Sequence, residues 1–298
     1  MKSIDADLRV GVIGLGLMGT AIVDRLLESQ FVPYIWNRTR EKAEPLVDRG
    51  AVWSDNPIAD CDRVIVSLYS SEVVESVLQR LKSSLRHGQI VIDTTTGDPE
   101  QSVIWEQRLA ESGASYLDSP ISGSSEQTRR GDATVIVSGR QQAFDACQDL
   151  WPVLGKSVFF VGASGYAAKM KLVTNLVLGL NRAALAEGLV FAESIGIDPG
   201  SALEVLRGSA AYSRQMDTKG LKMIDGDFTT QAKLSQHLKD VRLMLNAASA
   251  AGLDLPLADT HRLLLERAEG LGLGDLDNSA VIEAIRSSIR NAGKQSHR

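Results

Sequence analysis

The chain has 298 residues, of which 44% are hydrophobic and 23% charged, and its formal net charge is −5. This length allows two domains with sizeable cores, and the composition is typical of a soluble globular protein. The weakly negative charge argues against a general binder of nucleic acid or of anionic membranes. The two cysteines, Cys61 and Cys147, cannot form a disulfide framework and lack metal-ligand spacing. We therefore predict two buried thiols and no metal site.

The first half of the chain alternates β-rich runs with helical patterns. The predicted strands are residues 9–13, 31–36, 63–68, 89–93, 115–118, 133–138 and 157–161. The predicted helices begin at the glycine-rich turn after residue 13 and run to about residue 29, then cover 40–50, 71–85, 100–112 and 141–154. Strand–helix–strand repetition with short connections predicts an α/β domain with a mostly parallel, doubly wound, Rossmann-like sheet.

The β pattern stops after residue 162. Residues 167–195 predict one long helix, apolar around most of its circumference and therefore buried by other helices or by a second subunit. From residue 198 to about 291 every strong pattern of apolar residues has helical spacing. Asp198-Pro199 marks the start of one helix, and Asp277 is a candidate cap for the last helix. The predicted organisation is an α/β domain over residues 1–163, an interdomain helix over 164–195 and an all-α domain over 196–298. Residues 1–7 and 293–298 are expected to fray.

The N-terminal apolar stretch, residues 10–18, is short and is broken by Gly11, Gly14 and Gly16, which is unlike a signal peptide. No uninterrupted apolar run reaches about 18 residues, so no membrane span is predicted. A cytoplasmic location is the default expectation.

A glycine pattern follows the first predicted strand directly and opens a helix. In Gly14-x-Gly16-x-x-Gly19, the first glycine permits a sharp turn, the second lets a pyrophosphate approach the backbone, and the third lets helix and strand pack closely. The helix start then offers unpaired N–H groups to phosphate. The pattern predicts a dinucleotide site that includes Leu15 and Met18, rather than a purely structural glycine turn.

The end of the second predicted strand indicates which nicotinamide cofactor binds. An NAD enzyme normally carries Asp or Glu there, whereas this chain has Trp36-Asn37-Arg38-Thr39. A guanidinium can hold the 2′-phosphate of NADP, and Asn37 and Thr39 add neutral donors. The alternative is a solvated basic turn, and Glu41 lies close by. We predict NADP (NADPH) in preference to NAD.

Lys171 and Asn175 lie one helical turn apart on the long apolar helix. A cation and an amide on one face suit protonation of an oxygen while hydride arrives at its carbon, and a desolvated lysine readily acquires a lowered pKa. Lys169 is the rival, but it lies on nearly the opposite side of the helix. The alternative is that Lys171 merely extends from a buried helix to solvent.

Five ordered motifs resemble the β-hydroxyacid dehydrogenase family, which includes 3-hydroxyisobutyrate dehydrogenase, and cover nearly the whole chain. They are Gly14-Leu-Gly-Leu-Met-Gly19, Asp93-Thr-Thr-Thr96, Asp118-Ser-Pro-Ile-Ser122-Gly123-Ser124, Gly162-x-x-Gly165 leading to Lys171-x-x-x-Asn175, and Lys239-Asp240. The motifs are most similar to those of glyoxylate/succinic semialdehyde reductases.

The resemblance implies a role for each motif. Lys171 would be the catalytic acid/base, with Asn175 orienting it or holding the substrate oxygen. Ser122 and Gly123 would bind a substrate carboxylate, and Thr96 would meet both the cofactor ribose and the substrate. Lys239 would approach the cofactor. Without the resemblance, Ser122-Gly123 could be a plain loop and Lys239-Asp240 a charged helix segment.

Two positions depart from the family pattern. Ala167 stands where a further glycine is common, and Ala232 stands where the reductases often have an aromatic residue. Nearby polar residues are Thr229, Thr230, Gln231 and Gln236. This wall would admit a larger or more polar substrate.

The leading hypothesis is an NADPH-dependent oxidoreductase that interconverts a small aldehyde or keto acid, such as a semialdehyde, with its hydroxy acid. The alternatives are an imine reductase-like enzyme, against which Lys171 argues, and a non-catalytic NADP-binding module. The family resemblance implies a homodimer or homotetramer. The identity of the substrate and the physiological direction stay open.

Overall fold

The computed structural model describes residues 8–287. The chain divides into two compact units, Met1–Lys171 and Leu172–Arg298, so the division falls inside the long helix α9 (Tyr166–Ser194). Each unit has a hydrophobic core of its own.

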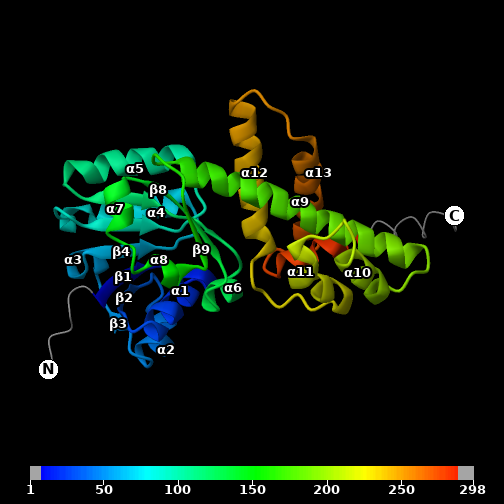
Figure 1. Ribbon diagram of the computed structural model, residues 1–298, viewed down its shortest axis with the longest axis horizontal. Coiled ribbons are helices and arrows are strands. Elements are labelled where there is room, and N and C mark those ends of the chain that lie inside the picture. Colours follow the sequence, from blue (N-terminus) through cyan, green and yellow to red (C-terminus); the bar gives the residue numbers. More distant parts are fainter. Residues whose placement is uncertain (1–7, 288–298) are drawn as a thin grey trace. The chain divides into compact units, whose positions relative to one another are not determined.

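The first unit is built on one mixed sheet whose strands run in the order β3-β2-β1-β4-β5-β6-β8-β7, with β9 also paired to β8 (Figure 1). The strands are β1 (Arg9–Ile13), β2 (Val32–Trp36), β3 (Val52–Trp53), β4 (Arg63–Val66), β5 (Ile90–Asp93), β6 (Ser115–Asp118), β7 (Ile121–Ser122), β8 (Thr134–Gly139) and β9 (Ser157–Phe160). Strands β1 to β6 are parallel, whereas β8 is antiparallel to β6 and β7. The predicted doubly wound α/β class is confirmed.

Helices cover both faces of this sheet. The helices are α1 (Leu17–Glu28), α2 (Glu44–Val47), α3 (Pro57–Asp60), α4 (Ser71–Leu81), α5 (Pro99–Glu111), α6 (Ser125–Arg129), α7 (Gln141–Asp145) and α8 (Trp151–Leu154), with 3₁₀ turns η2 (Arg40–Ala43) and η3 (Lys82–Ser84). Ile22 and Leu26 of α1 and Trp151 of α8 belong to one core cluster, whereas Val74 of α4 and Leu109 of α5 belong to another. Figure 1 accordingly shows α5 and α1 on opposite sides of the sheet. This arrangement leaves the carboxyl ends of the parallel strands at one edge, where open α/β sheets bind ligands.

The second unit is helical. After α9 come α10 (Pro199–Arg207), α11 (Arg214–Asp225), α12 (Leu234–Ala250), α13 (Pro256–Gly270) and the 3₁₀ turn η4 (Asn278–Ala280). Helices α12 and α13 lie side by side (Figure 1), and the core includes Leu185 and Leu189 of α9 with Leu238 of α12. Asp198 and Asp277 cap α10 and η4 through their side chains, as the sequence predicts.

Three details differ from the sequence prediction. The predicted helix over 40–50 is a 3₁₀ turn followed by the short α2, and the predicted helix over 141–154 is two short helices, α7 and α8. Pro45 and Pro152 lie at the starts of α2 and α8, because proline fits only the first turn of a helix. The two-residue strands β3 and β7 and the short helices α3 and α6 were not predicted. The predicted fraying of residues 1–7 and 293–298 lies outside the described residues.

Helix α9 is the one described helix whose length and mean hydropathy, 1.2 over its most apolar window, would suffice to cross a membrane. Those two measures do not separate a membrane helix from a core helix. Leu185, Ala186 and Leu189 of α9 are buried in the core of the helical unit, which favours a core helix. Cys61 and Cys147 are buried and unpaired, as predicted, and burial raises the pKa of each thiol to about 12.

Candidate active site

The glycine-rich turn between β1 and α1 has the geometry that its pattern predicts. Gly14 has a φ of +102°, and a Cβ there would lie 2.2 Å from the Ser67 carbonyl oxygen. A Cβ on Gly19 would lie 1.9 Å from the Gly14 carbonyl oxygen, whereas one on Gly16 would meet nothing within 4 Å. Gly14 and Gly19 are therefore required by close packing, and Gly16 leaves the start of α1 open to a phosphate group.

The end of β2 braces this turn. The side-chain oxygen of Asn37 accepts the Leu15 N–H at 3.0 Å, and its amide nitrogen donates to the Thr39 carbonyl at 2.8 Å. Asn37 thus holds the glycine turn, a role that the sequence did not predict. Arg38 and Thr39 are exposed, and the Arg40 guanidinium lies over the Trp53 ring at 4.9 Å. Met18, in the first turn of α1, accepts a hydrogen bond from the Thr128 hydroxyl.

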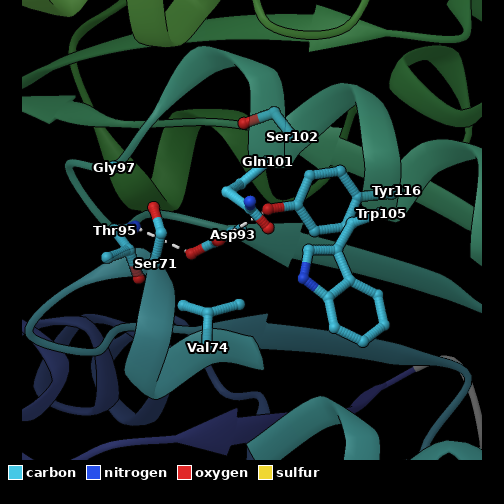
Figure 2. A pocket seen from close by; sticks show the side chains of 9 residues that line it. All are labelled: Ser71, Val74, Asp93, Thr95, Gly97, Gln101, Ser102, Trp105 and Tyr116. Carbon is cyan, nitrogen blue, oxygen red and sulfur yellow. Dashed lines mark hydrogen bonds between the residues drawn. The ribbon is translucent and has the colours of Figure 1, made fainter. Parts of the chain in front are cut away.

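Thr96 lies half-buried in the loop between β5 and α5. The preceding residues fix this loop: the Asp93 carboxylate accepts the Thr95 N–H at 2.9 Å and the Tyr116 hydroxyl at 2.6 Å. Figure 2 shows Thr95 and Tyr116 converging on Asp93 beside a cavity of about 10 Å³, room for about one water molecule. Burial raises the pKa of Asp93, although these hydrogen bonds oppose the shift.

Lys171 is buried, with 6% of its surface exposed. Its Nζ donates to the Ile121 carbonyl oxygen at 2.8 Å. Ile121 is the neighbour of Ser122, so the ammonium lies against the segment that carries Ser122 and Gly123. Lys169 is exposed, with its Nζ 5.3 Å from the Tyr166 ring centroid. Lys171, and not Lys169, therefore has the desolvated setting that a general acid/base needs.

Asp118, the last residue of β6, is a second buried acid beside this segment. Its Oδ2 accepts the Ala168 N–H at 2.8 Å and the Ser138 hydroxyl at 3.2 Å. Burial raises its pKa to about 7, and Asp93 adds to the shift, whereas the Ala168 amide opposes it. Asp93 and Asp118 are direct neighbours in the register of β5 and β6.

In the helical unit, Asn175 and Lys239 share one partner. The Asn175 amide nitrogen donates to Asp240 at 3.0 Å, and the Lys239 Nζ lies 3.3 Å from the same carboxylate. A carboxylate only accepts, so the amide oxygen of Asn175 points away from Asp240. Asp240 is buried and orients the Asn175 amide, so Lys239-Asp240 is not simply a charged surface segment.

The segment around Ala232 is held by a buried ion pair. Lys219 Nζ donates to both oxygens of Asp277, at 2.8 and 2.9 Å. The same carboxylate accepts the N–H groups of Gln231 and Ala232, at 3.0 and 3.2 Å. Asp277 therefore fixes the backbone of the segment that carries Gln231 and Ala232. Ala167, the other departure, is fully buried and donates its N–H to Ser138.

Sequence reasoning assigned no role to Asp93, Tyr116, Asp118 or Asp240. A signal existed for Asp93 and Asp118, because each is an acid at the end of an apolar strand. Among residues 8–287 no group of three or more His, Cys, Asp or Glu side chains is arranged to hold a metal ion.

Comparisons with known proteins agree with this geometry. The family model described as the NAD binding domain of 6-phosphogluconate dehydrogenase matches residues 9–162. The model described as NAD-binding of NADP-dependent 3-hydroxyisobutyrate dehydrogenase matches residues 165–285. Together with the fold, these matches define an NAD(P)-binding oxidoreductase.

Individual relatives extend over most of the chain. Glyoxylate/succinic semialdehyde reductase 1 of Arabidopsis thaliana is 32% identical over 94% of this chain and 99% of its own length. The chloroplastic reductase 2 of the same plant is 30% identical over 94% of this chain and 80% of its own length. A solved structure of Psf3 in complex with NADP+ and 2-OPP has a TM-score of 0.85 at 29% identity, over 93% of this chain and 99% of that chain. The chain belongs to the β-hydroxyacid dehydrogenase family.

Proposed function

We propose that the protein is an NADPH-dependent oxidoreductase that interconverts a small aldehyde or keto acid with its hydroxy acid, with Lys171 as the general acid/base. The observation that carries the proposal is the buried Lys171 ammonium, which lies 2.8 Å from the carbonyl oxygen of Ile121. Ile121 directly precedes Ser122 in the chain. Ser122 and Gly123 supply a hydroxyl and N–H groups suited to a carboxylate.

The nicotinamide, when bound, supplies or accepts the hydride at the reacting carbon. Lys171 then gives a proton to the carbonyl oxygen during reduction and takes it from the hydroxyl during oxidation. Asn175, one turn further along α9, presents its amide oxygen, because its amide nitrogen is engaged by Asp240. That oxygen orients the ammonium or accepts from the substrate hydroxyl.

The preference for NADPH rests on the end of β2. Arg38 is exposed there and Asn37 occupies the position at which NAD enzymes normally carry an acid. The description of the matched C-terminal model as NADP-dependent, and the NADP+ bound by Psf3, support the same preference. Thr96 and Lys239 are proposed to contact the cofactor as well.

The substrate class is proposed from the relatives and from the site. The Arabidopsis relatives are named as reductases of glyoxylate and succinic semialdehyde, which are small carbonyl acids. Ala232 and its polar neighbours favour a substrate larger or more polar than glyoxylate.

We also propose a homo-oligomer, a dimer or a tetramer. Val173, Val177 and Phe191 of α9 are each more than half exposed, which leaves apolar surface for a second copy to cover. Light scattering coupled to size-exclusion chromatography measures the oligomeric state, and a monomer at micromolar concentration would contradict this part.

The test of the proposed function is a substrate panel run with NADPH and NADH in parallel. The panel contains glyoxylate, succinic semialdehyde and other short semialdehydes, 3-hydroxy acids for the reverse reaction, and cyclic imines. We expect turnover of at least one carbonyl acid, faster with NADPH. Turnover of imines alone would indicate an imine reductase, and tight NADPH binding without any turnover would indicate a non-catalytic module.

A further inference from the structure

Side chains from the sheet hold the start of α9, in addition to local backbone hydrogen bonds. The first N–H groups of a helix have no partner within the helix. In α9 two of these groups, on Ala167 and Ala168, donate to the Ser138 hydroxyl at 3.0 Å and to the Asp118 carboxylate at 2.8 Å. Ser138 lies on β8 and itself donates to Asp118. Two strands therefore cap this helix together.

The residue before α9 cannot supply a cap of its own. Gly165 has no side chain, its φ is +85°, and a Cβ there would lie 2.7 Å from the Pro99 carbonyl oxygen. The glycine is required by close packing, so the cap comes from Asp118, 50 residues away in the chain from Ala168.

The same stretch of chain holds both the cap and Lys171. Asp118 contacts the first turn of α9, and three residues later the Ile121 carbonyl accepts Lys171 Nζ at 2.8 Å. The first two turns of α9 are thus attached at two points to the segment that leads to Ser122. Loss of the Asp118 contact would remove one of these two attachments and loosen the first turn of α9, from which Lys171 extends.

We infer that Asp118 is a positioning residue, which fixes the first turn of α9 on the sheet and thereby sets the place of the Lys171 ammonium beside Ser122. The inference rests on the proposed function, in which Lys171 is the acid/base. Asp118 itself would not contact the substrate.

Asp118 holds α9 through hydrogen bonds and not through an ion pair. The side chain is 2% exposed, and within residues 8–287 no salt bridge involves it. Asp93, the neighbouring acid, disfavours its ionised form. A buried carboxyl without a cation destabilises the fold relative to a neutral group of the same shape. An asparagine would keep an acceptor for Ala168 and a group that pairs with Ser138.

The experiment compares Asp118→Ala and Asp118→Asn with a matched control, Asp24→Asn. Asp24 is also a buried acid of the first unit, but it pairs with Arg49 and Arg129 and lies on α1, away from α9. The readouts are kcat, the Kd for NADPH, hydrogen exchange of the first turns of α9, and the rate of acetic anhydride labelling of Lys171 relative to the exposed Lys169.

We expect Asp118→Ala to lower kcat by about 10- to 100-fold, since small misplacements of a catalytic group have effects of this size. Its Kd for NADPH should stay within about threefold of wild type, because the glycine turn is untouched. Hydrogen exchange at the start of α9 and the Lys171 to Lys169 labelling ratio should both rise. Asp118→Asn should restore most of kcat, and Asp24→Asn should match wild type in all four readouts.

A kcat of Asp118→Ala within twofold of the Asp24→Asn value, or an unchanged labelling ratio, would overturn the inference. The proposed function fails separately, when Lys171→Ala retains wild-type kcat. The labelling ratio and hydrogen exchange report on Asp118 in either case, because they do not depend on turnover.

Discussion

The buried pair Lys219–Asp277 gives a prediction whose size follows from the structure. In Lys219→Met the apolar part of the side chain is kept and the ammonium is removed. Asp277 is then a carboxylate with 0% exposure that has lost its salt bridge to Lys219, although the buried Arg182 guanidinium still attracts it. Breaking a buried pair by removing one partner costs about 3–5 kcal/mol of the free energy of unfolding. Three backbone N–H groups and the Ser279 hydroxyl still reach the carboxylate, so we expect the lower end, about 3 kcal/mol.

The assay can separate the two units. All four tryptophans, at positions 36, 53, 105 and 151, lie in the first unit, so their fluorescence reports its unfolding. Hydrogen exchange of α11, followed as urea is raised, reports on the helical unit. Lys219→Met should shift this exchange transition to lower urea and leave the tryptophan transition nearly in place.

The double variant Lys219→Met/Asp277→Asn provides the control. It removes both charges, so it should be more stable than Lys219→Met by at least about 1 kcal/mol. Two results would contradict this expectation: a cost of less than about 1 kcal/mol for Lys219→Met, or a double variant destabilised by the sum of the costs of Lys219→Met and Asp277→Asn measured singly.

The remaining predictions concern cofactor and pH. Arg38→Ala should lower kcat/KM for NADPH by about 10- to 100-fold and change kcat/KM for NADH little, because a charge-assisted contact to the 2′-phosphate is lost. The control Arg40→Ala should change both values by less than about threefold. Equal losses with NADPH and NADH in Arg38→Ala would contradict this prediction. Gly16→Ala should unfold at the wild-type temperature yet bind NADPH at least about tenfold more weakly in calorimetry, because its Cβ meets only the space proposed for pyrophosphate. Burial raises the pKa of Asp118 from its ordinary 3.8 to about 7 in the folded protein. Between these two pH values the folded state binds a proton that the unfolded state has released, so the free energy of unfolding should fall as pH rises from about 4 to about 7. In Asp118→Asn the free energy of unfolding, measured by urea titration at each pH, should not show this fall. The same dependence on pH in Asp118→Asn and in wild type would count against a raised pKa at Asp118.

Local patterns in the sequence were enough to predict the fold and the glycine-rich turn between β1 and α1. Gly14, Gly16 and Gly19 act within six residues, and the alternation of strands and helices repeats along the chain, so both were predicted. The splitting of the 141–154 segment was also readable in principle, because Pro152 excludes one continuous helix. The two residues of β3 are too few to show a period.

Contacts between distant residues were not predictable. Asn175 and Asp240 are 65 residues apart, and nothing near either of them indicates the hydrogen bond that fixes the amide. The same holds for Asp118 and Ala168. The sequence shows that Lys171 lies on an apolar helix, but its burial and its bond to Ile121 depend on how the sheet and α9 pack.

The central claim is that Lys171 transfers the proton. The most direct measurement is kcat of Lys171→Ala against wild type at saturating NADPH, with the best substrate from the panel and with Lys169→Ala as the matched control. We predict a loss of about 10²- to 10⁴-fold for Lys171→Ala with an unchanged Kd for NADPH, and wild-type kcat for Lys169→Ala. A kcat of Lys171→Ala within about tenfold of wild type would contradict the account.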